Sequence, residues 1–212
     1  MQLRLQYIVP LPLAEKDFSA SDIWGKDVIF NAGEYVHVHA PSGTGKSTLL
    51  HILYRMRKDY SGDLFVQAKK MNWNAAEISN LRKNSFSIVF QEMRLFPLLT
   101  GWENLAVKNV LSKVGNENEI KNMMQLLGVT HLENKHAKTM SLGEQQRIAI
   151  IRSMLQPFQW LLLDEPFSHL DEENIRKAKQ LILATCEKNK AGLIIATLGE
   201  NYAIQFSKSL NL

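Results

Sequence analysis

The chain has 212 residues, of which 45% are hydrophobic and 22% are charged. This length fits one globular domain and leaves no room for a second enzyme domain. Lysine and arginine number 25 against 21 aspartates and glutamates, and the net charge of +4 indicates no particular partner. No stretch approaches the roughly 20 apolar residues that span a bilayer, so we expect any link to a membrane to come through a partner.

The N-terminal region, at about residues 1–34, predicts a small antiparallel sheet laid on the core. Apolar and polar residues alternate over residues 1–10, a pattern typical of a half-buried strand. Pro10, Pro12 and a turn at residues 31–34 then separate this region from the apolar run Tyr35–Val38. We expect that run to be the first strand of a mainly parallel core sheet.

A phosphate-binding loop is predicted directly after this strand, where residues 40–47 read A-P-S-G-T-G-K-S. The glycines let successive backbone N–H groups face a phosphate, and the following helix adds the positive end of its dipole. We expect Lys46 to reach the β- and γ-phosphates, Ser47 to bind Mg²⁺ and Thr48 to contact the α-phosphate. The predicted nucleotide-binding residues of this loop are Ser42, Gly43, Thr44, Gly45, Lys46, Ser47 and Thr48.

Ala40 departs from the pattern G-x-x-x-x-G-K-[ST], which has glycine at that position. A methyl group fits there if the backbone keeps a negative φ, so we expect a small cost. The alternative is a chance Gly-Lys-Ser turn on the surface. It is disfavoured by the strand before the loop and by the apolar helix residues Leu49, Leu50 and Leu53 after it.

Three further apolar runs are expected to complete the core sheet. They are Phe86–Phe90, Trp160–Leu163 and Leu193–Ala196, and each is followed by polar residues. Their wide spacing, with helical stretches between them, suits buried parallel strands joined by crossover helices. The predicted fold class is therefore α/β, in which ligands collect at the carboxyl ends of the strands.

Helices are expected to replace strands between residues 91 and 140. One predicted helix has an apolar stripe at i, i+3, i+4 and i+7, made by Ile120, Met123, Met124 and Leu127. Gly128 can end that helix. We therefore expect a single domain over residues 1–212, with a helical subdomain at about residues 92–140 and the remainder as the core.

An acidic pair, Asp164 and Glu165, follows the run Trp160–Leu163. At a strand end, Asp164 suits a second Mg²⁺ contact through water, and Glu165 is placed to polarise an attacking water. Alternatively, acidic residues in D-E-P favour the N-terminal dipole of a helix. Combined with the loop at residues 40–47, the pair indicates a site for ATP and Mg²⁺.

Together these segments resemble the ATP-binding subunits of ABC transporters over nearly the whole chain, closest in pattern to the lipoprotein-release, macrolide-efflux and cell-division ATPases. Residues 87–92 resemble the strand and glutamine loop of that family. Residues 141–147, S-L-G-E-Q-Q-R, are similar to its signature, and residues 168–171 to its dimer loop. The resemblance implies a P-loop NTPase core with an α-helical insertion that carries the signature loop.

The resemblance also implies roles at the hydrolytic site. Gln91 is expected to sense Mg²⁺ and the nucleophilic water, which makes Gln91 and Glu165 the predicted catalytic residues. The predicted metal-site residues are Ser47, Gln91 and Asp164.

A dimer around two ATP molecules is a further implication. The Ser141 hydroxyl and the Gly143 amide at a helix N-terminus then bind the γ-phosphate held by Lys46 of the opposite subunit. The alternative for this segment is a plain helix cap. Further nucleotide contacts implied by the resemblance are Gln145, Asp171 and an adenine-stacking Phe18, with Trp24 as the second candidate.

The apolar stretch Met93–Leu99 is expected to receive a short helix of an integral membrane subunit, as in related transporters. The alternative is that these residues fill the core of the insertion itself. The resemblance implies a cytoplasmic protein, peripheral on the inner face of the cell membrane through that partner. The second nucleotide-binding chain is expected to be an identical copy or a related ATPase.

Two leucines depart from the family pattern. Leu142 replaces the first of two signature glycines, and Leu198 stands where the family normally has histidine, with no histidine after His169. Leucine cannot donate a hydrogen bond to the γ-phosphate, so we expect hydrolysis to suffer more than nucleotide binding.

Because Glu165 is retained, the main hypothesis is an ATPase, slow or dependent on its partner, that drives transport, lipoprotein or lipid extraction or transenvelope signalling. The first alternative is an ATP-gated scaffold that regulates a membrane partner with little turnover. The second is a soluble ABC protein of DNA repair or translation. The lack of a long coiled-coil insertion and of a second cassette disfavours it, so we expect no nucleic-acid partner.

Overall fold

A five-stranded parallel sheet forms the centre of the computed structural model, which describes residues 1–72, 74–112 and 115–212. The strand order is β6-β7-β8-β3-β9, and every neighbouring pair is parallel. The strands are β3 (Tyr35–His39), β6 (Phe86–Val89), β7 (Trp160–Asp164), β8 (Gly192–Thr197) and β9 (Lys208–Asn211). The four predicted core strands are confirmed. The edge strand β9 was missed because K-S-L-N has no apolar run.

The second sheet is antiparallel and has the order β2-β1-β4-β5. Its strands are β1 (Leu3–Pro10), β2 (Asp27–Phe30), β4 (Tyr60–Val66) and β5 (Lys69–Lys70). The expected N-terminal antiparallel region is present, but its assignment to residues 1–34 is incomplete. β1 pairs with β4 along most of its length, so half of the strands come from chain that follows the phosphate loop.

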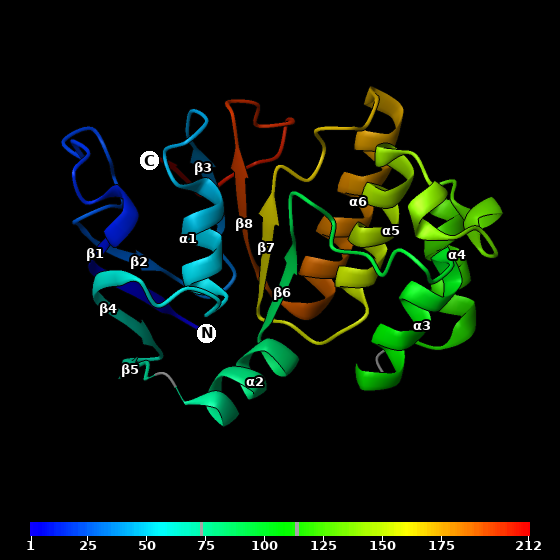
Figure 1. Ribbon diagram of the computed structural model, residues 1–212, viewed down its shortest axis with the longest axis horizontal. Helices are drawn as coiled ribbons and strands as arrows, with labels where there is room; N and C mark the ends of the chain where they lie inside the picture. Colours follow the sequence, from blue (N-terminus) through cyan, green and yellow to red (C-terminus); the bar gives the residue numbers. More distant parts are fainter. Residues whose placement is uncertain (73, 113–114) are drawn as a thin grey trace.

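Helix α1 (Lys46–Leu53) lies between the two sheets (Figure 1). Its buried leucines share one hydrophobic core with β1 on one side and with β7 and β8 on the other. Members of this core include Leu5, Leu49, Leu53, Leu162 and Ile194. The start of α1, and with it the phosphate loop, is therefore held between two rigid layers.

The other face of the parallel sheet is covered by α5 (Leu142–Met154) and α6 (Glu172–Asn189), with α3 (Gly101–Ser112) and α4 (Glu117–Leu126) beyond them (Figure 1). The predicted apolar stripe is found on α4, and Gly128 follows that helix with a φ of 64°. The remaining elements are α2 (Ala75–Asn84) and the short 3₁₀ turns η1 (Leu11–Leu13), η2 (Thr130–Leu132) and η3 (Ala137–Thr139). Among the helices in the described ranges, none has the length and apolar character to cross a bilayer.

Candidate nucleotide site

The segment between β3 and α1 has the backbone that a phosphate loop requires. Gly43 and Gly45 have φ values of 79° and 111°, which residues with a side chain rarely adopt. A Cβ atom on Gly45 would also lie 3.0 Å from Leu13 and 3.2 Å from Trp24. Ala40 is not among the residues with positive φ, so its methyl group is accommodated as expected.

Trp24 supports this loop from the side of the antiparallel sheet. Its side chain is 1% exposed, and its indole N–H donates to the Thr44 carbonyl at 3.2 Å. A buried indole cannot stack on adenine, so the expectation of Trp24 as the second candidate is wrong. Phe18 is half-buried and meets Trp24 edge-on, with ring centroids 6.5 Å apart. Its contact with adenine stays a prediction.

The loop residues share a cavity of 230 Å³ with distant segments of the chain. It is lined by Leu13, Ser42, Gly43, Gly45, Lys46, Ser47, Thr48, Gln91 and Glu165. The fold thus brings the predicted catalytic residues Gln91 and Glu165 to the loop. Leu13, which lies in the short turn η1, was missed because a single leucine in a turn carries no motif.

The Lys46 ammonium is the centre of charge in this cavity. It donates to the Ala40 carbonyl at 2.9 Å and to the Pro41 carbonyl at 3.2 Å, and it lies 3.3 Å from the Glu165 carboxylate. A second lysine, Lys16, donates to the Gly43 carbonyl at 2.8 Å and was not predicted. Two cations therefore border the place where the phosphates are expected.

Asp164 is the last residue of β7, and its carboxylate is buried. Burial raises its pKa to about 6, and the charge of Glu165 adds to this effect, while the Ser47 hydroxyl works against it. Its Oδ1 atom has no hydrogen-bond partner among the described residues. A buried, unpaired carboxylate oxygen beside a hydroxyl fits a hard divalent cation such as Mg²⁺.

Glu165 is held in an uncommon backbone conformation by two neighbouring elements. Its φ of 46° lies in the left-handed region, where non-glycine residues are strained. Its amide donates to the Ala196 carbonyl on β8 at 3.0 Å, and its carbonyl accepts from Gln146 on α5 at 3.1 Å. These two bonds hold the backbone of Glu165, whose carboxylate lies 3.3 Å from the Lys46 ammonium.

The signature segment begins α5 with reciprocal capping bonds. The Ser141 hydroxyl accepts from the Glu144 amide at 3.2 Å, and the Glu144 carboxylate accepts from the Ser141 amide at 2.8 Å. A Cβ atom on Gly143 would lie 2.7 Å from the His169 carbonyl, so this position needs glycine. The Gln145 side chain donates to the Met140 carbonyl. None of these signature residues lines the 230 Å³ cavity of the same chain.

Gln146 connects the signature helix to the segment after β7. It is 1% exposed, it donates to the Glu165 carbonyl, and it accepts from the His169 amide at 3.0 Å. Gln146 was not among the predicted site residues. Its role as a link was missed because its partners lie about 20 residues away in the chain.

A second cavity, of 840 Å³, adjoins Glu165 on the side of β8. Asp171, which caps α6, and Leu198 both line it. The Leu198 side chain is 58% exposed and offers no hydrogen bond. The histidine of the family pattern is therefore not replaced at this position by a polar group.

The stretch Met93–Leu99 divides into buried and exposed residues. Met93 is buried in the core of the helical layer. The expectation that Met93 belongs to the docking surface is therefore wrong. Phe96 and Leu98 are exposed, Leu98 by 69%. Phe96 also lines a cavity of 210 Å³ together with residues of α3 and the end of β6.

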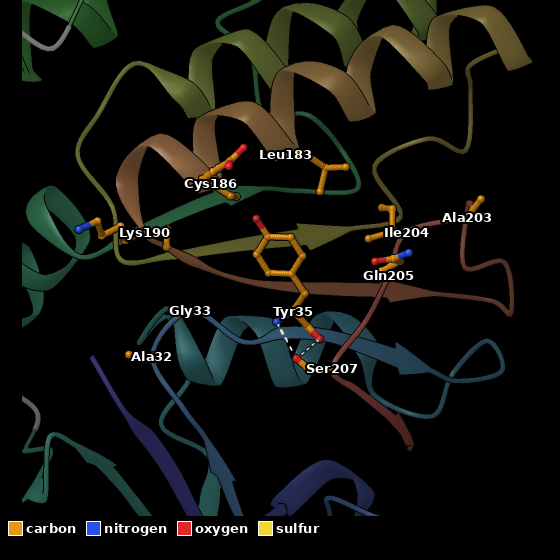
Figure 2. Close-up of a pocket in the computed structure, with 12 residues that line it drawn as sticks. Ala32, Gly33, Tyr35, Leu183, Cys186, Lys190, Ala203, Ile204, Gln205 and Ser207 are labelled. Carbon is orange, nitrogen blue, oxygen red and sulfur yellow. Dashed lines mark hydrogen bonds between the residues drawn. The ribbon is translucent and has the colours of Figure 1, made fainter.

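A larger cavity, of 1040 Å³, lies away from the nucleotide site (Figure 2). Tyr35 at the start of β3 points across it toward α6, and Ala203, Ile204, Gln205 and Ser207 also line it. The Cys186 thiol beside it is a poor nucleophile, because burial raises its pKa to about 12. Its lining shares no residue with the 230 Å³ cavity of the phosphate loop.

Comparison with known proteins shows matches of sequence and of fold. Residues 25–168 match the family model described as ABC transporter. The aliphatic sulfonates import ATP-binding protein SsuB of Bacillus cereus is 33% identical over 178 residues, which are 84% of this chain and 68% of that protein. The lipoprotein-releasing system ATP-binding protein LolD of Idiomarina loihiensis is 33% identical over 178 residues, 81% of this chain and 78% of that protein.

A solved structure gives the corresponding match of fold. It is the dimeric structure of a post-hydrolysis state of the ATP-binding cassette MJ0796 bound to ADP and Pi, from Methanocaldococcus jannaschii. The TM-score is 0.76 at 26% identity, over 95% of this chain and 90% of that chain.

Proposed function

This chain belongs to the ABC transporter family as an ATP-binding subunit of the ATPase type, and we propose that it closes with a second subunit around two ATP molecules to drive a separate membrane protein. The observation that carries the proposal is the convergence of Lys46, Gln91 and Glu165 on the cavity of the phosphate loop. Binding energy is then converted into closing and opening of two subunits.

Nucleotide binding is assigned to the phosphate loop. The backbone of residues 42–45 presents N–H groups, the N-terminus of α1 adds its dipole, and Lys46 exchanges loop carbonyls for phosphate oxygens. Mg²⁺ would be held by Ser47 and Gln91 and, through water, by Asp164, and it would neutralise charge on the phosphates. The unpaired Oδ1 atom of Asp164 supports this assignment.

Hydrolysis is assigned to Glu165 with Gln91. The Glu165 carboxylate accepts a hydrogen bond from the attacking water and aligns it, and Gln91 orients the same water. Glu165 is fixed by its backbone bonds to Ala196 and Gln146, so its carboxylate needs little reorganisation. The departure at Leu198 removes one donor, which predicts slow turnover or turnover that depends on the partner.

The second subunit supplies the signature in this proposal. Ser141, Gly143 and Gln145 lie outside the loop cavity of their own chain, which supports their action on the nucleotide of another subunit. The cassette that was solved as a dimer with ADP and Pi is similar to this chain in fold, which also supports the proposed dimer. Asp171 caps α6 and lines the 840 Å³ cavity together with Glu165, and it is proposed as a further nucleotide contact. Phe18 remains the proposed adenine contact.

The membrane partner is proposed to dock on the exposed apolar residues of the helical layer. They are Phe96, Leu98, Val107, Val110 and Leu111. Phe96, Val107 and Leu111 also line the 210 Å³ cavity at the junction of α3 with the core, and an apolar helix face fits such a surface. The proposed location is the inner face of the cell membrane, through this partner. SsuB and LolD serve different cargoes by name, so the likeness supports a transport partner without choosing a cargo.

The decisive experiment compares phosphate release by the wild-type chain and by Glu165→Gln, each with the membrane protein that co-purifies with it. We expect the wild type to hydrolyse ATP, and the variant to bind ATP and form a stable dimer without turnover. Equal background rates with ATP-dependent dimers of both proteins support instead the ATP-gated scaffold that the exposed Leu198 favours. Failure of the Glu165→Gln variant to dimerise with Mg-ATP contradicts both.

A further inference from the structure

His37 lies in the middle of β3 and bonds to both neighbouring strands. Its ring is 5% exposed and stacks on Phe206, with ring centroids 5.1 Å apart. Its Nε2 atom lies 2.8 Å from the Thr197 hydroxyl at the end of β8, and its Nδ1 atom lies 3.4 Å from the Ser209 hydroxyl on β9. A histidine in a parallel core strand is an unusual choice, since apolar residues fill such positions.

The direction of these hydrogen bonds follows from the Thr197 hydroxyl. It lies 2.9 Å from the Glu200 carbonyl oxygen, which can only accept, so Thr197 donates there. The hydroxyl must then accept from His37, which places the imidazole proton on Nε2. Nδ1 is left to accept from Ser209, and the bonds run in one direction from Ser209 through His37 and Thr197 to Glu200.

A neutral imidazole is required by this arrangement, because it has one donor and one acceptor. Burial lowers the pKa of His37, and the neighbouring His39 adds to that effect. The Gly199 amide also donates to the Thr197 hydroxyl, at 3.3 Å. The hydroxyl of Thr197 is thereby saturated, and residues 197–200 are held to β3 through His37.

The fastened loop forms one wall of the cavity beside Glu165. Thr197, Leu198, Gly199 and Glu200 all line the 840 Å³ cavity, together with Glu165 and Asp171. The loop also begins directly after Ala196, whose carbonyl accepts from the Glu165 amide. Displacement of the loop would therefore move the support of the catalytic carboxylate.

We propose that His37 is a positioning residue for ATP hydrolysis, which holds the loop of residues 197–200 in place through Thr197. The proposal rests on the ATPase function proposed above. Leu198 offers no hydrogen bond, so the effect assigned to His37 is on the position of the loop, which the buried bond from β3 to Thr197 supports. His37 itself touches neither nucleotide nor water in this role.

The test uses the full chain with its co-purified membrane partner and compares His37→Leu, His37→Gln and the control His39→Leu. Gln can still donate to Thr197, whereas Leu cannot. His39 lies on the same strand with its ring beside Gly199, and it makes no side-chain hydrogen bond to the part of the chain that the structure describes. The control therefore separates loss of the hydrogen bond to Thr197 from loss of a ring that packs beside the loop. We expect His37→Leu to lower kcat about tenfold with KM for ATP within about twofold, and the other two variants to stay near wild type.

Hydrogen exchange of the peptide that covers residues 196–205 gives a second readout, independent of turnover. The Gly199 amide is expected to exchange about tenfold faster in His37→Leu, and at the wild-type rate in His37→Gln. Thr197→Val, which keeps the side-chain shape, should reproduce both effects if His37→Leu folds poorly.

Wild-type kcat in His37→Leu or Thr197→Val, equal loss in His37→Gln, or unchanged exchange of the loop would overturn the role of His37. If the wild type itself shows no hydrolysis above Glu165→Gln, the proposed ATPase function fails, and the positioning role in catalysis fails with it. The exchange data then still decide whether His37 holds the loop.

Discussion

The Lys46 ammonium lies 3.3 Å from the Glu165 carboxylate, and both side chains are largely buried. One residue starts α1 and the other follows β7, so the contact joins the phosphate loop to the predicted catalytic base. A phosphate group that enters the cavity competes with Glu165 for the same cation. Under the proposed function, Glu165 would be released to act on water only when the nucleotide is in place, which would couple binding to catalysis.

Replacement of Lys46 by methionine should weaken both the nucleotide site and the folded state. The change leaves Glu165 partly buried without its cation, at a cost of about 1–3 kcal/mol. We expect a lower melting temperature and the loss of stabilisation by Mg-ATP in differential scanning fluorimetry. Lys16→Met serves as the matched control, because Lys16 also contacts the loop but is exposed, and it should keep most of the ATP response.

Asp164→Asn should stabilise the nucleotide-free protein while it removes the Mg²⁺ site. Burial raises the pKa of Asp164 to about 6, against 3.8 for an ordinary Asp, so its charge opposes folding as pH rises through that window. The variant is expected to gain about 2–3 kcal/mol over wild type at pH 7.5 in EDTA, and little below pH 4. Thermal unfolding at the two pH values measures this, and an equal melting temperature at pH 7.5 would contradict it.

Glu144 should contribute stability through its cap on α5. Burial acts to raise its pKa, but hydrogen bonds from Lys135, the Ser141 amide and His131 prevail and lower it to about 2. A depressed pKa means that this stability is present above about pH 4.5 and is lost as pH falls toward 2. Glu144→Ala is expected to cost about 1 kcal/mol in urea unfolding at pH 7. At pH 3 the difference from wild type should shrink, and a constant difference would show that the charge is irrelevant.

Leu198→His should restore a donor beside Glu165. An added hydrogen bond to the transition state is expected to raise kcat about 10- to 100-fold with little change in KM for ATP. Leu198→Ala is the control, since it removes the side chain without adding a donor, and it should remain at the wild-type rate. Steady-state phosphate release in the presence of the membrane partner measures the effect. No gain in the histidine variant would show that the γ-phosphate lies out of reach of this position.

Leu98→Asp should impair assembly with the membrane subunit and leave ATP binding intact. The Leu98 side chain is 69% exposed in the proposed docking surface, so a charge there opposes apolar docking. Leu11→Asp, on a leucine of η1 that is 59% exposed, should not affect assembly. Co-purification of the tagged chain from detergent extracts provides the measurement. Equal recovery of the partner with both variants would place the docking surface elsewhere.

Features that depend only on neighbouring residues in the sequence could be predicted from the sequence alone. The phosphate loop needs only glycines, a lysine and a following helix, all within residues 40–53, because local backbone geometry decides the loop. The four apolar core strands and the acidic pair at residues 164–165 are equally local. The alternation over residues 1–10 identified β1 for the same reason.

Tertiary structure decided whatever depends on contacts between distant segments. The pairing of β1 with β4, the edge strand β9, the burial of Trp24 under the loop and the bond from His37 to Thr197 left no local pattern. Residue propensity and hydrophobic periodicity indicate whether a segment forms a helix or a strand and which of its faces is buried. Long-range packing decides which other segment of the chain contacts that face. The chain alone therefore indicated the chemistry of the site, and the fold decided which groups hold that chemistry in place.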